Sequence, residues 1–351
     1  MPKGFGVMPD YGAKIADKAF DQSTRKIREV YRQAAVDLQD KMSAFLARHQ
    51  KKGAEMLKKL QDGEITQAAY HSWMRGQVFV GKQWKKKVKS AVMMLDTANK
   101  QCAEIIREGK LTVLAENYNF AAYKLEKKIG GAISFDLYNE RAAAKLLKTN
   151  PKLLPEWKIH ERKDYAWNRQ KIENAITQGI IQGEGIPQIT ERLATSLCTQ
   201  NENRMNLFAR TSMTGAQNAG RQAEMDDAED MGITVKKRWV ATLDNRTRDT
   251  HQRLDGQVVP KDQPFIIDDM EIMFPGDPSC QYPELVYNCR CTMEEVYDGI
   301  ETRRVRRAYY DEEEQAEIDE ARGDGRHHRD SYIVENMTYT EWKEWKERGR
   351  K

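Results

Sequence analysis

The sequence predicts an α+β protein in which an elongated, basic helical bundle precedes a small mixed α/β domain and a short helical tail. Proline use is the first observation behind this division, since only Pro2 and Pro9 precede Pro151 and seven more follow it. Charge is the second, because residues 1–150 carry 28 Lys and Arg against 16 Asp and Glu, whereas residues 151–300 carry 18 against 24. A long proline-free stretch rich in Ala, Lys, Leu, Gln and Glu is typical of helices.

We therefore expect a helical domain at residues 1–150, a mixed domain at residues 151–298 and a charged tail at residues 299–351. A length of 351 residues suits about two domains, and 39% hydrophobic residues exclude a chain that is disordered throughout. No apolar run approaches the roughly 20 residues of a membrane span, and the N-terminus lacks the apolar segment of a secretory signal. Five cysteines, an odd number, do not describe a disulfide scaffold, so we expect a reducing, intracellular location and no membrane partner.

Long helices are expected in the first 150 residues. Apolar residues recur every three, four or seven positions along one helix face, at Phe20, Ile27, Tyr31, Ala34, Leu38, Met42 and Phe45. Asp62-Gly63 breaks this pattern, and we expect further helices at about 94–108, ended by Gly109, and at about 113–128. Short breaks between long helices favour antiparallel neighbours in a bundle.

A basic cluster lies within this helical part. It combines Trp84 with five lysines, Lys82, Lys85, Lys86, Lys87 and Lys89. Lysines beside an aromatic residue can bind the phosphate backbone of DNA, in a manner that weakens with salt. A solvated helix face is the competing interpretation of such a run.

The segment from Glu202 to Met231 predicts another long helix, which Gly232 ends. Small and apolar side chains share one of its faces, at Met205, Ala209, Met213, Ala216, Ala219 and Ala223. An alanine stripe lets a helix lie close to its neighbour. The polar residues beside the stripe either line a site or form helix surface and caps, and they are Arg204, Arg210, Thr211, Gln217, Asn218 and Arg221.

Strands and turns are expected after residue 234. Residues 235–241 alternate as a strand does, Asp255-Gly256 signals a hairpin turn, and Cys289 and Cys291 fall two apart in an apparent strand. Alternation would place both thiols on one face of that strand. With His251 and Cys280 they could form a tetrahedral zinc site, in which Asp244 or Asp277 could replace one ligand. The alternative is two small buried residues under a loop, with His251 hydrogen-bonded to a carboxylate.

Catalysis is a second hypothesis for the same residues. His251 with Asp244 or Asp249 could act as a general base, and Arg246 or Arg248 could stabilise an anion, as in a nuclease. Such residues also make ordinary salt-bridged loops. Because the sequence holds no serine elbow and no phosphate-binding glycine loop, we expect a non-enzymatic protein with no catalytic residues.

Across residues 170–295 the order and spacing of these pieces resemble the phage Mu F-like minor head protein family, also called the phage head morphogenesis domain. The resemblance includes Thr242, Thr247, Leu254-Asp255, Pro264-Phe265, Pro275-Gly276-Asp277-Pro278, Cys289 and Cys291. The residues that form the core of the motif are Trp239, Asp244, Arg246, Arg248, His251, Gly256, Asn288 and Arg290.

This resemblance implies a minor capsid protein of a tailed bacteriophage that assists head morphogenesis. Its implied partners are the portal protein, the major capsid protein, scaffold and the viral DNA. It implies a location in the virion, at the portal vertex or inside the capsid, and in the host cytoplasm during assembly. The resemblance says little about residues 1–150.

The tail ends in a predicted helix after Met337, capped by Thr338 or Thr340. Trp342 and Trp345 give this otherwise charged helix one apolar edge. The edge fits either a docking peptide for a larger partner or a latch that returns to its own domain.

Overall fold

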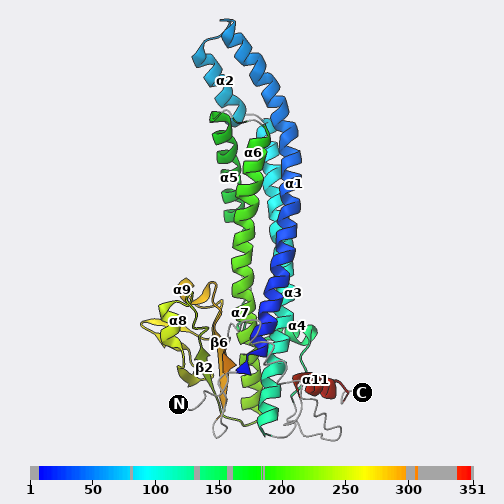
Figure 1. Cartoon of the computed structure of the whole chain (residues 1–351), viewed down its shortest axis with the longest axis vertical. Coiled ribbons are helices and arrows are strands. Elements are labelled where there is room, and N and C mark those ends of the chain that lie inside the picture. Colours follow the sequence, from blue (N-terminus) through cyan, green and yellow to red (C-terminus); the bar gives the residue numbers. More distant parts are fainter. Residues whose placement is uncertain are drawn as a thin grey trace. The chain divides into compact units, whose positions relative to one another are not determined.

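The structure, a computed structural model, describes residues 8–79, 82–129, 135–155, 161–182, 184, 186–297, 305–306 and 338–348. These residues are mostly helical, with short strands in small sheets, which confirms the predicted α+β class (Figure 1). None of the helices in these ranges combines the length and the apolar character of a membrane-spanning segment. Most of the tail, at residues 298–304 and 307–337, lies outside the described residues.

Three helices occupy most of residues 11–129: α1 (Tyr11–Gln61), α2 (Gln67–Phe79) and α3 (Lys82–Ile129). The predicted break at Asp62-Gly63 is confirmed, and Gly63 has a φ of 76° there. The predicted end at Gly109 is wrong, because α3 continues through it. A glycine inside a helix costs only about 1 kcal/mol relative to alanine, and burial of Ile106 and Val113 on either side outweighs that cost.

The remaining elements follow in chain order. The helices are α4 (Glu140–Thr149), α5 (Glu161–Ile181), α6 (Ile186–Leu193), the π-helical turn η1 (Ala194–Cys198), α7 (Thr199–Asp230), α8 (Asp249–Leu254), α9 (Pro283–Val286) and α11 (Tyr339–Arg348). The strands are β1 (Met8–Pro9), β2 (Val235–Val240), β3 (Val258–Pro260), β4 (Phe265–Ile267), β5 (Met270–Ile272), β6 (Thr292–Tyr297) and β7 (Val305–Arg306).

The described residues divide into two compact units that alternate along the chain. Unit 1 takes those within residues 1–22, 106–157 and 207–351, and unit 2 those within residues 23–105 and 158–206. The domain boundaries expected after residues 150 and 298 stay predictions, since compact units are not by themselves independently folding domains.

Unit 2 is a helical assembly built on the apolar stripe of α1. Ile27, Tyr31, Leu38 and Met42 are at most 1% exposed, as the spacing predicts. The Tyr31 hydroxyl donates a hydrogen bond to Asn99 Oδ1 on α3 at 2.5 Å. The stripe is therefore the core of the unit rather than a binding surface.

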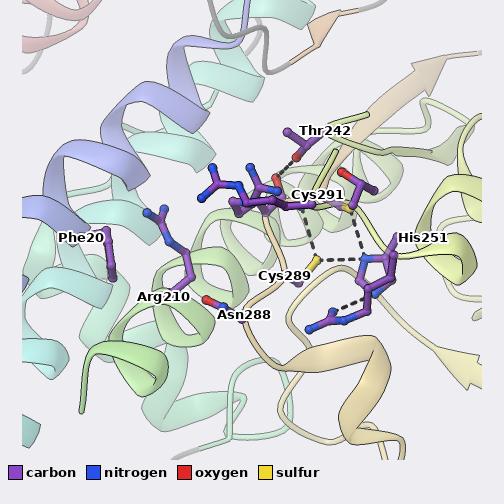
Figure 2. A pocket seen from close by; sticks show the side chains of 11 residues that line it. Phe20, Arg210, Thr242, His251, Asn288, Cys289 and Cys291 are labelled. Atoms are coloured by element: carbon purple, nitrogen blue, oxygen red, sulfur yellow. Dashed lines mark hydrogen bonds between the residues drawn. The ribbon is translucent and has the colours of Figure 1, made fainter. Parts of the chain in front are cut away.

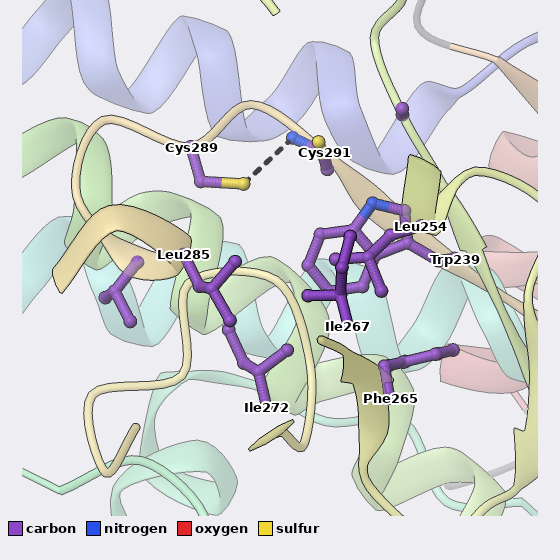
Figure 3. Packing of buried hydrophobic residues seen from close by; sticks show 10 residues of the cluster. Trp239, Leu254, Phe265, Ile267, Ile272, Leu285, Cys289 and Cys291 are labelled. Carbon is purple, nitrogen blue, oxygen red and sulfur yellow. Dashed lines mark hydrogen bonds between the residues drawn. The ribbon is translucent and has the colours of Figure 1, made fainter. Parts of the chain in front are cut away.

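Unit 1 contains an antiparallel sheet of order β3-β2-β6 and the antiparallel pair β4-β5. Trp239 of β2 is fully buried and meets Phe265 edge-on, with ring centroids 5.3 Å apart (Figure 3). Around these two rings the core cluster contains Ala241, Leu254, Ile267, Ile272, Leu285, Val286, Cys289 and Cys291. The strand predicted at residues 235–241 is thus confirmed over Val235–Val240, where it is the middle strand of the sheet.

Helix α7 packs closely against its neighbours within unit 1. The predicted alanine stripe is buried along its whole length, and the helix ends before Gly232, which has a φ of 86°. A Cβ at Gly215 would lie 2.6 Å from the carbonyl oxygen of Gly276, and one at Gly220 would lie 2.3 Å from that of Leu114. Both contacts are too short for any side chain, so glycine is required at both positions.

The terminal helix α11 is a latch on unit 1. Trp342 is fully buried, and its indole N–H donates to Glu126 Oε2 on α3 at 2.6 Å. Tyr339 donates to Glu116 Oε2 at 2.8 Å. The predicted cap at Thr338 is present, since the Glu341 amide donates to Thr338 Oγ1 at 3.3 Å while the Thr338 amide donates to Glu341 Oε2 at 2.8 Å.

Candidate functional site: an arginine-lined pocket with a buried Cys-His-Cys group

Unit 1 contains a pocket of about 340 Å³ that gathers much of the predicted motif (Figure 2). Its lining residues are Phe20, Arg210, Thr242, Arg246, Thr247, Arg248, His251, Asn288, Cys289, Arg290 and Cys291. Residues from distant parts of the sequence, such as Phe20 and Cys291, therefore share one small volume. Trp239, Asp244 and Gly256 of the predicted motif core are outside this lining.

His251 enters the pocket wall from α8, a short helix that the sequence did not predict. Arg248 precedes the helix in extended conformation, and Asp249 occupies its first turn. The His251 side chain is 2% exposed and its ring lies edge-on to Trp239, with centroids 5.7 Å apart. The Asp255-Gly256 pair follows α8, and Gly256, with a φ of 83°, leads into β3. Strands β2 and β3 do pair antiparallel, but α8 lies between them, so the Asp255-Gly256 pair is not by itself the turn that joins two strands.

Cys289 and Cys291 lie in a loop rather than in a strand. Strand β6 begins only at Thr292, so the expectation that alternation places both thiols on one face is wrong. Asn288 has a φ of 57°, and this left-handed residue turns the chain after α9. The loop nevertheless brings both thiols to one side, where each side chain is 2% exposed.

Three polar side chains hold the carbonyl groups of this loop. Thr214 Oγ1 donates to the Cys289 carbonyl at 2.7 Å, and Thr242 Oγ1 donates to the Arg290 carbonyl at 2.9 Å. Asn218 Nδ2 donates to the Cys291 carbonyl at 3.4 Å and to the Pro275 carbonyl at 2.9 Å, while its Oδ1 accepts the Met293 amide at 2.9 Å. These buried contacts fix the loop and the start of β6 against α7.

The sequence predicted only some of the α7 residues that make these contacts. Thr211 accepts the Asn288 amide at 3.0 Å, and Gln217 donates to Thr292 Oγ1 at 2.8 Å. The sequence marked Thr211, Gln217 and Asn218 as candidates but missed Thr214. The spacing of residues 211, 214 and 218 places them on one helix face and could have identified the missing one.

His251, Cys289 and Cys291 form a compact group of donor atoms. His251 Nδ1 lies 3.3 Å from Cys291 Sγ and 3.6 Å from Cys289 Sγ. All three donor atoms lie within 4.8 Å of one another, and all three residues are buried. A hydrogen bond with Cys289 and one with His251 lower the pKa of the Cys291 thiol, whereas burial raises the pKa of Cys289. The predicted ligands on α8 and on the loop thus do meet.

Cys280, the fourth predicted ligand, lies outside that group among the residues that the structure describes. Its Sγ is 3.4 Å from the carbonyl oxygen of Glu271, and burial raises the pKa of its thiol. The two carboxylates considered as substitutes have other partners. Asp277 Oδ1 accepts the Ser279 amide at 2.8 Å, and Asp244 pairs with Arg290.

Arginines give the pocket its positive charge. Arg290 donates to Asp244 from both terminal guanidinium nitrogens, Nη1 to Oδ2 and Nη2 to Oδ1, the latter at 2.7 Å. This pair lowers the pKa of the Asp244 carboxyl. Arg248 donates to the Tyr287 carbonyl at 2.5 Å. Arg210 lies 3.6 Å above the Phe20 ring and pairs with Asp17 at 2.6 Å. Arg246, whose side chain is 67% exposed, approaches Asp244 at 4.0 Å.

The proposed general-base pair does not form in this geometry. The polar contacts of the His251 ring are with the two thiols, Arg248 and the Glu284 carbonyl. Within the described part of the chain, neither Asp244 nor Asp249 is among them. Asp249 is 82% exposed and faces Arg253 at 3.8 Å. The arrangement therefore does not support the nuclease alternative.

The predicted DNA-binding lysines lie on the first turns of α3, in unit 2. Lys85, Lys86 and Lys89 are exposed and Lys87 is half-buried, while the side chain of Lys82 is outside the described set. Val88 between them is 2% exposed and anchors this turn. The charges of the cluster are thus exposed to solvent. Both interpretations, DNA binding and a solvated helix face, require this exposure.

Comparison with known proteins finds similarity to a phage family in the region that contains the site. Residues 170–294 match the family described as Phage Mu protein F like protein, which confirms the resemblance seen in the sequence. Minor head protein GP7 of Bacillus phage SPP1 is 29% identical over 248 residues, which cover 70% of this chain and 73% of GP7.

A second similarity is shorter. A protein of Enterococcus faecalis named NAD(+)--arginine ADP-ribosyltransferase EFV is 33% identical over 131 residues, or 37% of this chain. The chain spans only 26% of the length of that protein. An uncharacterized protein of Haemophilus influenzae is 29% identical over an equal length. No solved structure matches the chain.

Proposed function

We propose that this chain, whose residues 170–294 form a Phage Mu protein F-like region, is a minor head protein that assists head morphogenesis in a tailed bacteriophage. The observation that carries the proposal is the similarity to the SPP1 minor head protein GP7, because it extends over 70% of the chain and well beyond the motif. The similarity to the EFV protein covers about a quarter of that protein and supports no enzymatic role.

The geometry of the motif agrees with a structural role. Its charged residues are engaged in holding loops, as in the Arg290 pair with Asp244, and its polar residues bind backbone groups. An active site would instead need a base that can reach a substrate proton, whereas His251 is 2% exposed. The motif therefore builds a fixed surface and pocket, as an assembly component requires.

The partners in this proposal are the portal protein and the major capsid protein, with scaffold during assembly. The protein would then reside in the virion, at the portal vertex or inside the capsid, after assembly in the host cytoplasm. A fixed pocket rich in arginine suits an acidic protein segment as well as a nucleic acid, since guanidinium groups bind carboxylates and phosphates alike.

Deletion of the gene from a phage that carries it tests this function. We expect fewer filled heads or a lower infectivity per particle, with restoration when the intact chain is supplied from a plasmid. Particle counts by electron microscopy and plaque titres measure the two effects. Normal yield and normal infectivity in the deletion phage would exclude an assembly role.

DNA binding through the lysines of α3 is an additional part of the proposal. The supporting observation is the exposure of Lys85, Lys86 and Lys89 within a single helical turn. Each lysine that neutralises a phosphate contributes about 0.9 to the slope of log affinity against log salt. Replacing Lys85, Lys86, Lys87 and Lys89 by Gln should therefore lower that slope by up to about 3–4.

A charge-matched variant distinguishes the loss of contacts between the α3 lysines and DNA from the effect of a lower net charge. It replaces four exposed lysines that lie elsewhere in the sequence by Gln, namely Lys18, Lys26, Lys145 and Lys148. Titration of duplex DNA at several salt concentrations, followed by fluorescence anisotropy, measures both variants. If both variants keep the slope of the unmodified chain, the cluster on α3 is a solvated surface only.

A further inference from the structure

We propose that His251, Cys289 and Cys291 bind one zinc ion through His251 Nδ1 and the two Sγ atoms, with an exchangeable fourth ligand supplied from the arginine-lined pocket. The proposal stands independently of the proposed function, because it rests on the geometry of unit 1. It also differs from the four-ligand site that the sequence suggested, since Cys280 takes no part. The support comes from distances, from the histidine tautomer and from the way the loop is held.

The distances between the donor atoms suit a tetrahedral ion. With Zn–S near 2.3 Å and Zn–N near 2.0 Å, tetrahedral angles set the nitrogen-to-sulfur separation at about 3.5 Å. The structure has 3.3 Å from His251 Nδ1 to Cys291 Sγ and 3.6 Å to Cys289 Sγ (Figure 2). Both nitrogen-to-sulfur separations therefore lie within about 0.2 Å of the value that a tetrahedral zinc ion needs.

The Glu284 carbonyl beside His251 suits the tautomer that a metal needs, while Arg248 Nη1, 3.4 Å from His251 Nε2, suits the other. The same Nε2 lies 3.3 Å from the backbone carbonyl oxygen of Glu284. A hydrogen on Nε2 donated to that carbonyl leaves the lone pair of Nδ1 directed at the two thiols. Metal-binding histidines commonly use their other nitrogen in this way, which fixes the ring and raises its basicity.

The cysteine loop is shaped before any ion binds. The left-handed Asn288 and the hydrogen bonds from Thr214 and Thr242 fix its backbone on either side of the thiols. The Cys291 amide also points at Cys289 Sγ, at 3.3 Å, as an N–H group does toward a metal-bound thiolate (Figure 3). Side chains held in this way lose little conformational entropy when they bind a metal.

The pocket explains why the fourth ligand would be exchangeable. All three donor residues line it, and no further His, Cys, Asp or Glu of the described chain belongs to the group. A closed structural zinc site has four protein ligands, whereas three protein ligands leave a position for water or an anion. Arg246 and Arg248 line the same pocket, so an anionic oxygen ligand would be favoured there.

Metal analysis of the full chain, purified without a metal-affinity tag and under reducing conditions, tests the proposal. We expect about one zinc per chain, and Cys289→Ser or Cys291→Ser should lower the zinc affinity by more than the roughly 10–100-fold cost of losing an outer partner. The matched control is Cys280→Ser, a cysteine of the same unit that is outside the group, and it should keep the metal.

Two measurements on the unmodified chain keep the test decisive if the serine variants fail to fold. X-ray absorption at the zinc edge should give two sulfur ligands and at least one imidazole nitrogen. In the cobalt-substituted protein, added azide should change the visible spectrum, because an exchangeable ligand is replaced. Folded, reduced protein that takes up no zinc, a Cys280→Ser variant that loses it, or a spectrum insensitive to azide would each contradict the site as proposed.

Discussion

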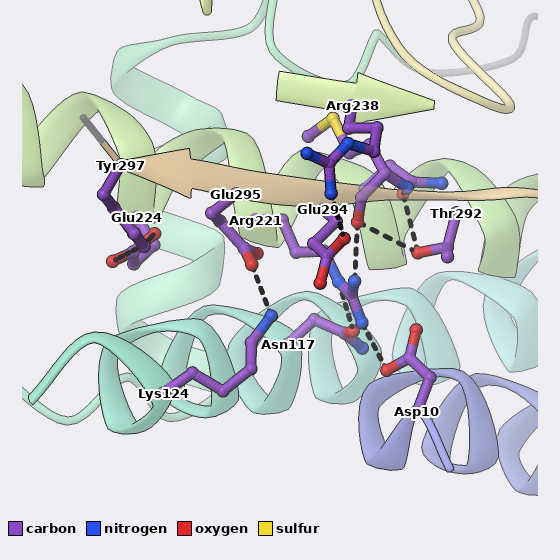
Figure 4. Close-up of polar contacts among 12 residues, drawn as sticks. Asp10, Asn117, Lys124, Arg221, Glu224, Arg238, Thr292, Glu294, Glu295 and Tyr297 are labelled. Carbon is purple, nitrogen blue, oxygen red and sulfur yellow. Dashed lines mark hydrogen bonds and ion pairs between the residues drawn. The ribbon is translucent and has the colours of Figure 1, made fainter. Parts of the chain in front are cut away.

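Arg221 is buried to 1% exposure, and its partners come from separate parts of the chain (Figure 4). It donates to Asp10 Oδ1 at 2.5 Å and to the Met293 carbonyl at 2.6 Å, and it lies 3.4 Å from Asn117 Oδ1. Burial would raise the pKa of Asp10, but the charges of Arg221 and Lys124 outweigh burial and lower it. Arg221 therefore joins α7 to α3, to β6 and to the residue that precedes α1. Removing Asp10 would leave the buried charge of Arg221 unpaired.

The pKa of Glu224, in the same region, shifts in the opposite direction from the pKa of Asp10. Glu224 is fully buried and accepts hydrogen bonds from the Tyr297 hydroxyl at 3.1 Å to each carboxyl oxygen. Burial and the nearby charge of Glu295 raise its pKa well above the ordinary value, although Lys124 acts in the other direction. The folded state therefore binds a proton at Glu224 more tightly than the unfolded chain does, and Asp227 adds to this effect.

Replacement of Glu224 by Gln should change how stability depends on pH. Because the pKa of Glu224 is raised on folding, its contribution to the free energy of unfolding falls as pH rises above the ordinary value of about 4.3. Glutamine lacks this titration, so the free energy of unfolding of the variant should rise relative to that of the unmodified chain as pH increases above about 5, by at most about 1.4 kcal/mol per pH unit.

Urea unfolding of both proteins at several pH values measures the difference. Glu229→Gln, which removes a half-exposed carboxylate from the same helix, is the matched control for the loss of one charge. A difference between the Glu224→Gln variant and the unmodified chain that stays constant with pH would contradict the raised pKa.

At the scale of elements, helix α7 organises unit 1. Gly215 and Gly220 allow backbone to approach within contact distance, and Asn218 between them joins the helix to β6 and to the loop at Pro275. The helix therefore supplies both the packing surface and the polar contacts of the cysteine loop. This explains why the motif extends so far upstream of the residues that line the pocket.

Much of this arrangement could be predicted from the sequence because the signals are local. The apolar spacing of α1, the alanine stripe of α7 and the stop at Gly232 each depend on nearby residues only. The end predicted at Gly109 was wrong because packing of the flanking residues outweighs a glycine. Helix α8 was missed because its six residues carry a charged sequence with little apolar periodicity.

The site was harder to predict, because its geometry depends on contacts distant in sequence. The types of residue at His251, Cys289 and Cys291 suggested a metal group, but the strand assumed for the cysteines was wrong. Asn288 adopts its left-handed conformation within a framework that α7 provides, through its bond to Thr211. No local pattern distinguishes the three residues that meet from Cys280, which does not join them.

At the scale of the whole molecule, the chain passes between its two units several times. The boundary between the units falls inside α1, α3 and α7, so the basic residues 1–150 contribute to both. The boundaries that net charge and proline content indicate in the sequence therefore differ from the boundaries between the two compact units. The motif pocket belongs to unit 1 and the lysine cluster to unit 2, which makes them separable targets for mutation.

The central claim is that this chain is a component of a phage head. The most direct test is the protein content of purified particles from a phage that carries the gene, washed with nuclease and high salt and quantified by mass spectrometry. The account predicts that the chain stays with procapsids or virions at a fixed ratio to the portal subunit. Its absence from both kinds of particle, while it is abundant in the infected cell, would contradict the account.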